Sequence, residues 1–488
     1  MRPMLFPRGV YYAAVAAVAT LLLSTLPNRA AHFDDAWNAE LAYWLVKDGY
    51  PRSELFRSIG DGSEQHAYVF HKAFTYFQAG LMRGLGFNLY AAKAPGLIFS
   101  AVGLGLLLCA FRGPGRGEAR WLAAFLYLGC GALVSAAFIG RPEPLAMSAG
   151  LASFLLLRGA RGRVRCLIGA GALGGLAGLA HLHGLIFLMA GGLWLLVRRT
   201  RWTGVLAFGA AGTLAVALYP LDAVLNHQLP MLFYQFSHAP VTQASQHGWA
   251  KLATLLDYQE VYFHSEGEAA LTVLLLAVVA LAWGHRPRPR QLLRFTETQQ
   301  YVLLLVLSFW VLCARAAGYY FLLVLPFFII AAVKLILGAW PRLVPGRRLA
   351  LRVLLGLYPL GAGVRAYYLW REKQDAPWPA TENARLARYM PRQGSVAVVP
   401  LDFFFDEIGH YRLRGLTAYA MRNRDQYHDT LSVVGFFALA ARDSAQYVVT
   451  DHSSRNDAYP VPANAPARIG RYVRVYQDQW HSVYRRDE

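Results

Sequence analysis

The sequence predicts a mainly α-helical, polytopic membrane protein with a small α/β domain at its C-terminal end. Of the 488 residues, 56% are hydrophobic and only 16% are charged, and the mean hydropathy is +0.30. Soluble globular proteins contain about 25% charged residues. Apolar runs long enough to cross a bilayer recur throughout residues 1–370. Residues 371–488 instead combine β-branched runs with helical patterns, as soluble α/β domains do.

Apolar runs of roughly 17–22 residues are expected to form about eleven membrane-spanning helices. The first run follows Arg2 and Arg8, so a signal peptide that ends near the sequence NRAA is an alternative. A helix that starts in the cytoplasm agrees better with the charges of the later loops. The expected spans are residues 10–27, 91–111, 121–139, 143–157, 166–180, 184–197, 203–222, 269–283, 301–315, 319–338 and 350–368.

The basic residues predict the orientation of these helices. The formal net charge is +19, but Lys and Arg cluster in short runs between apolar segments, which does not indicate a nucleic-acid-binding surface. The loops RGARGRVR and HRPRPRQLLR are strongly basic, whereas GRPEP and AHLHG on the opposite side hold at most one arginine. We therefore expect a cytoplasmic N-terminus, a periplasmic or extracellular C-terminal domain and contact with anionic lipids. The chain shows no organelle-targeting signal, and a bacterial inner membrane is the expected location.

Three longer segments are expected on the external side. They are the first external loop at 28–90, a second large loop at 223–268, and the soluble domain at 371–488. In the soluble domain, GSVAVVP, QYVVT and RYVRVYQ are strand-like, while TENARLARYM and SVVGFFALAARD are helical in pattern. The 4 cysteines lie in or beside apolar runs, so this domain is expected to fold without disulfides.

Two neighbouring acids, Asp34 and Asp35, follow the first expected span. Trp37, Leu41 and Trp44 share one face of the next helix, which predicts a helix lying in the membrane interface. The acids would then lie at the depth of lipid head groups. They fit a helix cap with a first-turn acid, or else a general base whose pKa its neighbour raises, or a metal ligand. The residues leave these alternatives open.

Two external turns carry further polar candidates. Arg141 and Glu143 form either a turn ion pair or a fixed pair that binds a phosphate and supports a base or a metal ion. His181 and His183 either cap a helical hairpin or contact a phosphate or a sugar. Because histidines two positions apart do not share a helix face, a two-histidine metal site on a helix is not expected.

The remaining external cations are candidates for anion binding. Arg315, at a helix end, either extends to the membrane surface or binds an anion. Lys72, in a second aromatic-rich interfacial segment at 66–86, and Arg365 are weaker candidates of the same kind, and Lys334 is expected only to reach the cytoplasmic surface. Possible acceptor contacts are Asp222, His238, His247, His264 and Glu266.

The stretch DDAWNAELAYWLVKDG resembles the start of the first external loop of the GT-C membrane glycosyltransferases. The likeness is to the branch of the protein O-mannosyltransferases and the lipid A aminoarabinose transferase. Asp34 and Asp35 take the places of the two acids of that pattern, and Ala39, Glu40 and Gly49 also match.

Three later stretches extend the resemblance over about residues 10–370. HKAFTYFQAGLMRGLGFNLYAAKAP matches the second element at Lys72, Tyr76, Gly86 and Lys93, although both prolines of that element are missing. GRPEPLAM is similar to the turn that opens the fourth helix of the family, and RAAGYYFLLVLPFF is similar to a helix late in its membrane domain. The missing prolines, and HLHG where some relatives carry Thr-Lys-Gly, leave the donor sugar open.

The resemblance implies an inverting glycosyltransferase with a GT-C fold. It would take a sugar from a polyprenyl phosphate in the outer leaflet and transfer it to a hydroxyl group of a glycolipid, a polysaccharide or a protein. Asp34 would be the general base, and Lys72, Arg141, Arg315 and the two histidines would stabilise the leaving phosphate. A divalent ion, Mg²⁺, Mn²⁺ or Zn²⁺, is a possible cofactor shared by Asp34 and Glu143.

A transporter of a lipid-linked or small anionic substrate is the alternative from another class. It predicts charges near the middle of helices, broken helices and paired halves. The expected spans are nearly free of charge in their interiors, and their polar residues gather at the external ends. The sequence contains no Gly-rich phosphate loop after a strand, and no GxSxG, HExxH or CxxC motif.

Overall fold

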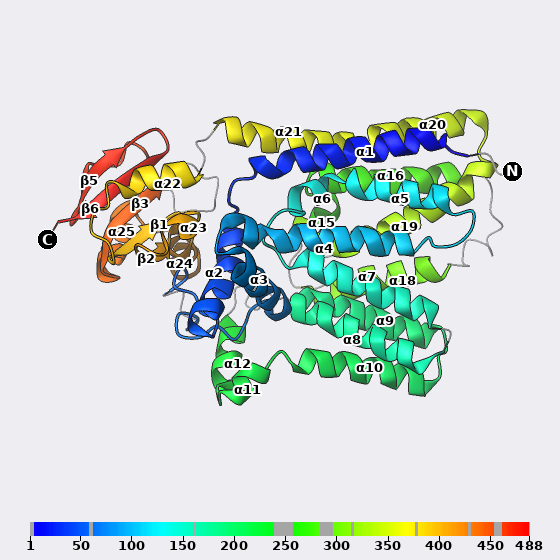
Figure 1. The fold of residues 1–488 in the computed structure, drawn as a ribbon, viewed down its shortest axis with the longest axis horizontal. Helices are drawn as coiled ribbons and strands as arrows, with labels where there is room; N and C mark the ends of the chain where they lie inside the picture. The colour runs from blue at the N-terminus through cyan, green and yellow to red at the C-terminus, as the bar shows by residue number, and fades with distance from the viewer. Residues whose placement is uncertain are drawn as a thin grey trace.

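The computed structural model describes residues 4–487 except for 58–61, 161, 239–256, 284–295, 314–316, 376–378, 428–430 and 453–460. Two candidate residues, His247 and Arg315, lie outside the described residues. The chain forms an elongated helical bundle with a small sheet domain at one end (Figure 1). The helices of the bundle are α1 (Arg8–Thr25), α4 (Leu89–Cys109), α5 (Gly117–Leu128), α6 (Gly131–Ala136), α7 (Glu143–Gly159), α8 (Val164–Ala180), α9 (Leu185–Val197), α10 (Trp202–Ala217), α16 (Glu266–Trp283), α18 (Glu297–Leu312), α19 (Phe321–Ala339), α20 (Pro345–Leu357) and α21 (Leu360–Asp375).

Each of the eleven expected spans overlaps a helix of the bundle. Among the described residues, 4 helical stretches are long and apolar enough to cross a membrane, namely Arg8–Thr25, Leu89–Cys109, Gly318–Arg342 and Pro345–Arg371. The third expected span is divided between α5 and α6 at Gly129, which a continuous apolar pattern does not reveal.

The core of the bundle forms around α19. The ring of Phe327 on α19 stacks on Phe187 of α9 and on Tyr301 of α18. Helices α8 and α10 approach closely through glycines, since a Cβ on Gly175 would lie 2.5 Å from the backbone oxygen of Gly212. The run GALGGLAGLA is therefore a helix-packing face, as small residues are in many membrane proteins.

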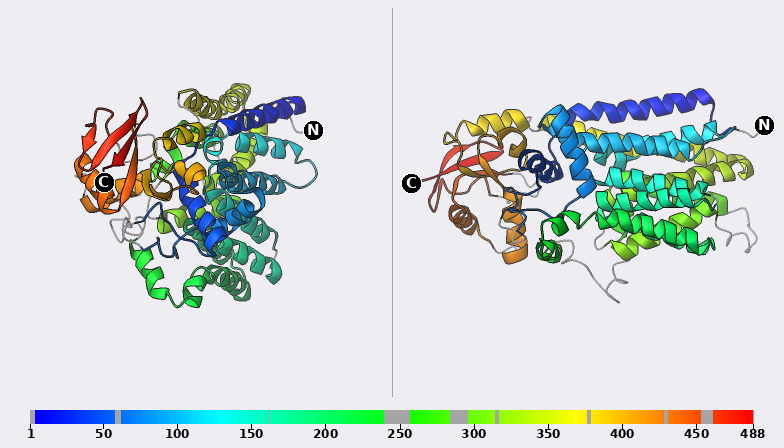
Figure 2. Two further views of the ribbon diagram at one scale, coloured as in Figure 1. Left: turned by 60° about the vertical axis from the view of Figure 1, so that its left-hand side comes forward. Right: turned by 60° about the horizontal axis from the view of Figure 1, so that its bottom comes forward.

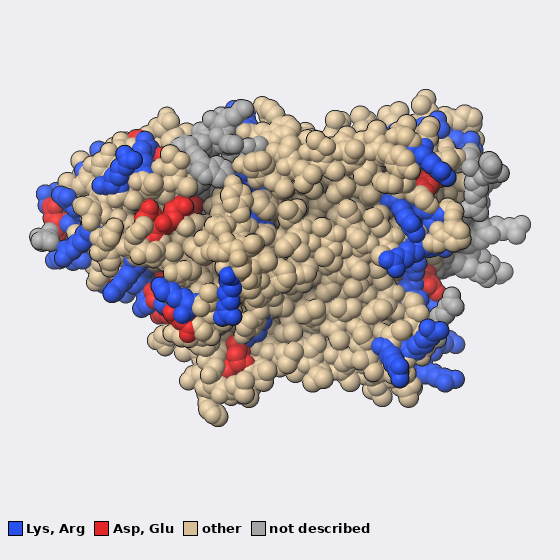
Figure 3. Space-filling model, viewed as in Figure 1, with Lys and Arg blue, Asp and Glu red and all other residues tan. Residues whose placement is uncertain are grey.

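Charged side chains gather at the two ends of the molecule (Figure 3). Between them, this view shows a broad band over the bundle that is almost free of Lys, Arg, Asp and Glu. The end that bears the N-terminus is rich in basic residues, which come from the loops predicted to be cytoplasmic. The opposite end carries both signs of charge and adjoins the sheet domain. Such a charge-free band is the surface that lipid tails tolerate.

Short helices cross the end of the bundle that faces the sheet domain (Figures 1 and 2). The first of these helices, α2 (Phe33–Asp48), has an aromatic face that was predicted to lie in the membrane interface. That face is instead covered by protein. Leu41 and Trp44 are buried, and Trp37 packs on Phe56 of the first loop. The sequence pattern could not distinguish a lipid-facing aromatic stripe from a protein-facing one. The helices at this end are α2 (Phe33–Asp48), α3 (Lys72–Leu85), α11 (Leu221–Leu225), α12 (Leu229–His238) and α15 (Gln259–Phe263).

The C-terminal part is an α/β domain, as the strand-like runs predicted. Its sheet has the strand order β2-β1-β3-β6-β5-β4, in which β1 pairs in parallel with β2 and β3 while β6 is antiparallel to β3 and β5. The strands are β1 (Val396–Val399), β2 (Arg412–Gly415), β3 (Ala445–Asp451), β4 (Arg468–Ile469), β5 (Tyr472–Gln477) and β6 (His481–Arg486). The helices are α22 (Pro379–Ala387), α23 (Phe403–Glu407), α24 (Leu416–Tyr427) and α25 (Val433–Arg442).

The sheet domain docks on the first external loop. The backbone N–H of Gly415 donates to the carbonyl of Leu55 at 2.8 Å, and Arg414 lies 3.7 Å from Glu54. Nearby, Tyr43 of α2 packs edge-on against Phe404 of α23. The loop is therefore held between the bundle and the domain, which fixes the position of α2.

Candidate active site

The N-terminus of α2 is closed by His32 and Asp35. The Nδ1 atom of His32 accepts a hydrogen bond from the N–H of Asp34 at 3.2 Å, and Asp35 Oδ2 accepts one from the N–H of His32 at 2.7 Å. This reciprocal arrangement is a capping box, in which two orphan backbone donors are satisfied together. The capping role considered for the acid pair thus falls on Asp35, with His32 as its partner.

Asp35 is completely buried and bonded on both oxygens. Its Oδ1 accepts from the N–H of Gly140 at 2.5 Å, and its Oδ2 lies 3.0 Å from the Nζ of Lys93. Lys93 is also buried and donates to the carbonyl of Ala30 at 2.5 Å. Asp35 therefore fastens α2 to α4 and to the turn before α7, and its oxygens are not available to a substrate.

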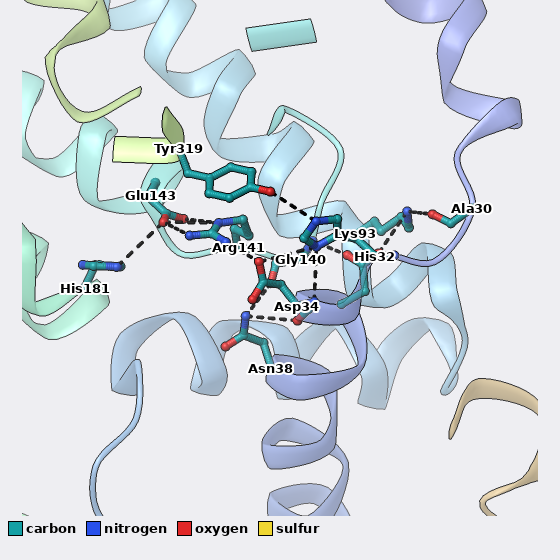
Figure 4. Close-up of polar contacts among 11 residues, drawn as sticks. Ala30, His32, Asp34, Asn38, Lys93, Gly140, Arg141, Glu143, His181 and Tyr319 are labelled. Carbon is teal, nitrogen blue, oxygen red and sulfur yellow. Dashed lines mark hydrogen bonds and ion pairs between the residues drawn. The ribbon is translucent and has the colours of Figure 1, made fainter. Parts of the chain in front are cut away.

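Asp34 is held differently. Its Oδ2 forms an ion pair with Arg141 Nη1 and lies 3.4 Å from His32 Nδ1 (Figure 4). Within the described part of the chain, no hydrogen bond is made to its Oδ1. Burial raises the pKa of Asp34 above its ordinary value, although Arg141 and His32 oppose that shift. The carboxylate is positioned by one oxygen and is able to accept a proton on the other.

Arg141 bridges two acids. Its Nε lies 3.1 Å from Glu143 Oε2, its Nη1 pairs with Asp34, and its guanidinium lies 4.0 Å from the ring centre of Tyr319. Burial alone would lower the pKa of Arg141, but Asp34 and Glu143 hold it well above the ordinary value. Tyr319 in turn places its hydroxyl 3.4 Å from His32 Nε2, so Asp34 lies in a connected polar network.

The histidines extend this network away from Asp34. His181 Nε2 lies 3.8 Å from Glu143 Oε1, and its ring stacks on His71 with 4.7 Å between ring centres. His181 Nδ1 accepts from the N–H of His183 at 3.0 Å. Burial lowers the pKa of His71 to about 4 and that of His181 well below its ordinary value. Near neutral pH these two rings are therefore uncharged and would contribute hydrogen bonds rather than positive charge.

Lys72 lies at the start of α3, next to His71, but it does not join the Asp34 network. Its ammonium group pairs with Asp222 of α11 and lies 5.0 Å from the ring centre of Tyr219. Burial lowers the pKa of Lys72, while Asp222 opposes the shift. Asp222, considered above as an acceptor contact, is instead the counter-ion of Lys72.

The other expected contacts have local partners. Glu266 lies 3.4 Å from Arg365. His238 lies 2.9 Å from the carbonyl of Tyr234. Lys334, expected to reach the surface, contacts the hydroxyl of Thr298. None of these side chains contacts Asp34 within the described residues, so the site is built around the turns that hold Asp34, Arg141 and His181.

Sequence reasoning missed three members of the site. His32 stands three positions before Asp35, which is the spacing of a capping box, but histidine is an unusual cap. No sequence pattern marked His71 or Asn38 as a member of the site. Asn38 donates to the carbonyls of Asp34 and Gly140 at 3.1 and 2.8 Å. Its role depends on a turn far away in the chain.

The shared metal ion expected at Asp34 and Glu143 does not fit these side chains. The guanidinium of Arg141 lies between the two carboxylates and pairs with both, so it occupies the position that a shared metal ion would take. Among the described residues, the one group of His, Cys, Asp and Glu side chains that converge closely enough for a metal ion is Glu382, Asp478 and His481 in the sheet domain.

No protein-family model matches the chain, and no curated protein matches it by sequence. The fold, however, matches solved structures. ArnT from Cupriavidus metallidurans bound to undecaprenyl phosphate has a TM-score of 0.65 at 14% identity, with 98% of both chains covered. The apo oligosaccharyltransferase of Archaeoglobus fulgidus has a TM-score of 0.54 at 14% identity, covering 91% of this chain and 70% of that one.

A second structure of the archaeal enzyme AglB from Archaeoglobus fulgidus, in complex with an inhibitory peptide and a dolichol-phosphate, has a TM-score of 0.51 at 13% identity, covering 90% of this chain and 69% of that one. These proteins are GT-C glycosyltransferases. The expected GT-C fold is thereby confirmed over nearly the whole chain, from the bundle to the sheet domain.

Proposed function

We propose that this protein is a membrane glycosyltransferase that transfers a sugar, with inversion, from a polyprenyl phosphate to a hydroxyl acceptor. Two features support the proposal. The fold is shared along its full length with ArnT, whose structure holds undecaprenyl phosphate. The chain also buries the carboxylate of Asp34 on α2, a helix at the end of the bundle away from the N-terminus (Figure 1). The observation that carries the proposal is the environment of Asp34, which is buried, has a raised pKa and is oriented by Arg141.

The reaction needs one proton acceptor beside the attacking oxygen. The acceptor hydroxyl donates a hydrogen bond to Asp34, its oxygen attacks the anomeric carbon, and the bond from that carbon to the phosphate oxygen breaks. The proton ends on Asp34, and the phosphate leaves with the bonding electrons. A single displacement of this kind inverts the anomeric centre. The raised pKa makes Asp34 a better proton acceptor than an exposed aspartate, while Arg141 fixes its orientation.

The leaving phosphate requires hydrogen-bond donors and positive charge. Arg141 is already shared by two carboxylates, so its free charge is small. Lys72 would supply a full charge if the phosphate replaced Asp222 as its partner. His181 and His183 would contribute N–H donors, and Arg315 remains a proposed contact from outside the described residues. No step requires a metal ion at Asp34, which fits the position of Arg141.

The remaining assignments belong to the same proposal. The N-terminus and the basic loops would face the cytoplasm of a bacterium, and the site and the sheet domain would face the periplasm. The donor would enter sideways from the outer leaflet of the inner membrane. The acceptor would be a glycolipid, a glycan or a protein, whose hydroxyl group reaches Asp34 from the external side.

The proposal is tested with Asp34→Asn. Vesicles that contain the variant should transfer sugar from a polyprenyl phosphate donor about 10²–10⁴-fold more slowly, which is the range for loss of a general base. Asp48→Asn is the matched control, because Asp48 ends the same helix and, among the described residues, pairs with Arg52 alone at the surface. Mass spectrometry of envelope glycolipids from cells with and without the protein identifies the sugar and the acceptor to use. Wild-type transfer by Asp34→Asn would refute the assignment of the base.

A further inference from the structure

A second polar cluster lies in the sheet domain, away from the candidate active site. It combines Glu382 of α22, Asp478 of the turn between β5 and β6, and His481 at the start of β6. One ligand atom from each of these side chains lies within 4.8 Å of the others. The helix α22 runs beside the sheet where the chain enters the domain (Figure 1), so the cluster joins two elements that are distant in sequence.

The spacing within the cluster is that of ligands around one ion. His481 Nδ1 lies 3.3 Å from Glu382 Oε1, yet this nitrogen is buried and forms no hydrogen bond with any described residue. Two ligands at about 2.1 Å from a tetrahedral zinc ion lie about 3.4 Å apart. A buried imidazole nitrogen that approaches a carboxylate without bonding to it calls for a third, bridging partner.

The guanidinium of Arg385 occupies the position between the carboxylates of Glu382 and Asp478. Arg385, one turn after Glu382 on α22, forms ion pairs with both Glu382 and Asp478 through Nη2. Its side chain is 42% exposed, whereas that of Glu382 is 7% exposed. The Nε of Arg385 makes no hydrogen bond to the described residues. The guanidinium is held by these ion pairs and by the ring of Tyr476, whose centre lies 5.4 Å away, and the exposed part of the side chain borders the solvent into which it would move when an ion binds.

The surroundings of the cluster carry excess negative charge. Asp402 follows β1 and Asp451 ends β3, so both lie at the carboxyl edge of the parallel strands, where β1 separates β2 from β3. Asp451 pairs in register with His481. Burial raises the pKa of Asp402 to about 6, and its Oδ1 has no hydrogen-bond partner among the described residues. The carboxyl edge beside such a topological switch point is where α/β sheets bind ligands.

The cluster is also reachable from solvent. A cleft of about 460 Å³ opens on it and is lined by Glu382, Arg385, Asp478, Gln479 and Trp480. Asp478 is already oriented, because its Oδ1 accepts the N–H groups of Trp480 and His481 at 2.7 Å each. Its Oδ2 accepts from the hydroxyl of Tyr476 at 3.0 Å and pairs with Arg385, so the carboxylate would keep its orientation after Arg385 leaves.

We propose that Glu382, Asp478 and His481 form a site for a divalent transition-metal ion, with Zn²⁺ as the best match, and that Arg385 leaves when the ion binds. Carboxylate oxygens and imidazole nitrogens are both ligands of Zn²⁺, and a water molecule would complete the tetrahedron. The ion would clamp α22 to the edge of the sheet. This site is separate from the sugar-transfer site and does not depend on its assignment.

The test uses the full-length protein in detergent, stripped with a chelator and dialysed against Zn²⁺, with bound metal measured by mass spectrometry. One ion per chain is expected. His481→Gln and Glu382→Gln should each weaken binding at least tenfold. Arg385→Gln should tighten it several-fold, because a competing charge is removed. Glu407→Gln is the matched control: Glu407 pairs with His410 at 3.1 Å, and no third ligand among the described residues joins them, so binding should not change.

Two results would overturn the proposal. One is the absence of stoichiometric zinc in the wild-type protein. The other is zinc binding that His481→Gln and Arg385→Gln leave unchanged. If Glu143→Gln instead removes the bound zinc, the ion belongs to the membrane domain and the assignment to the sheet domain is wrong. Arg385→Gln keeps the test decisive even if a ligand variant misfolds. If the cluster is only a structural ion-pair network, this variant should be less stable and should not bind zinc more tightly.

Discussion

The neighbouring acids Asp34 and Asp35 should respond in opposite ways to the same substitution. Asp35→Asn keeps an oxygen for the N–H of Gly140 but removes the negative charge that faces Lys93 at 3.0 Å. Lys93 is 1% exposed, so water does not replace the lost partner. Removing one member of a buried ion pair costs about 3–5 kcal/mol. Asp35→Asn should therefore lower the free energy of unfolding by about that amount.

Asp34→Asn should cost less stability and more activity. Arg141 keeps Glu143 as a partner after the change, so no charge is left alone, and a loss of about 1–2 kcal/mol is expected. A second-site change checks the electrostatic reason. Lys93→Met in the Asp35→Asn background removes the isolated charge and should recover about 2 kcal/mol, although Lys93→Met alone should be harmful.

The assay is unfolding by SDS in mixed micelles, followed by tryptophan fluorescence, with sugar transfer measured on the same samples. Asp48→Asn again serves as the surface control. The reasoning fails if Asp35→Asn is as stable as Asp34→Asn, or if the double variant is no more stable than Asp35→Asn. Either result would mean that the contact between Asp35 and Lys93 does not hold α2 in place.

Three further predictions concern single contacts. Burial raises the pKa of Glu40 from 4.5 to about 7, so the folded protein binds this proton more tightly than the unfolded chain does. The free energy of unfolding should therefore fall by about 3 kcal/mol as the pH rises from 4.5 to 7. Glu40→Gln should remove that fall when unfolding is measured across this pH range. Gly175→Ala should reduce the yield of folded protein, because the new Cβ would lie 2.5 Å from a carbonyl oxygen of α10. Gly209→Ala is the control, since its Cβ meets nothing within 4 Å and the change should be neutral. Size-exclusion profiles of the two variants measure the difference. Lys72→Gln should raise the KM for a polyprenyl phosphate donor more than tenfold. Asp222→Asn should lower this KM, because Asp222 competes with the phosphate for the same ammonium group. Steady-state kinetics that give both variants the wild-type KM would argue against a phosphate contact at Lys72.

Much of the architecture was predictable from local patterns. The apolar runs and the strand-like segments after residue 371 correspond to helices and strands of the structure. The number of crossing helices was less accessible, because breaks such as Gly129 depend on how helices pack. The aromatic face of α2 was misread for a related reason: Trp44 is hydrophobic enough for lipid or for protein, and its neighbour in space decides which it contacts.

The sequence alone determined the membrane class, the α/β tail and the presence of paired acids and cations at loops of one predicted side. Only the tertiary structure decided what each of them does. Asp34 and Asp35 have nearly the same local sequence, yet Arg141 contacts one from 107 positions away and Gly140 contacts the other from 105. A carboxylate takes its basicity and its availability from burial and from the charges around it. Those surroundings come from distant turns, so the different contacts of Asp34 and Asp35 became visible only in the folded chain.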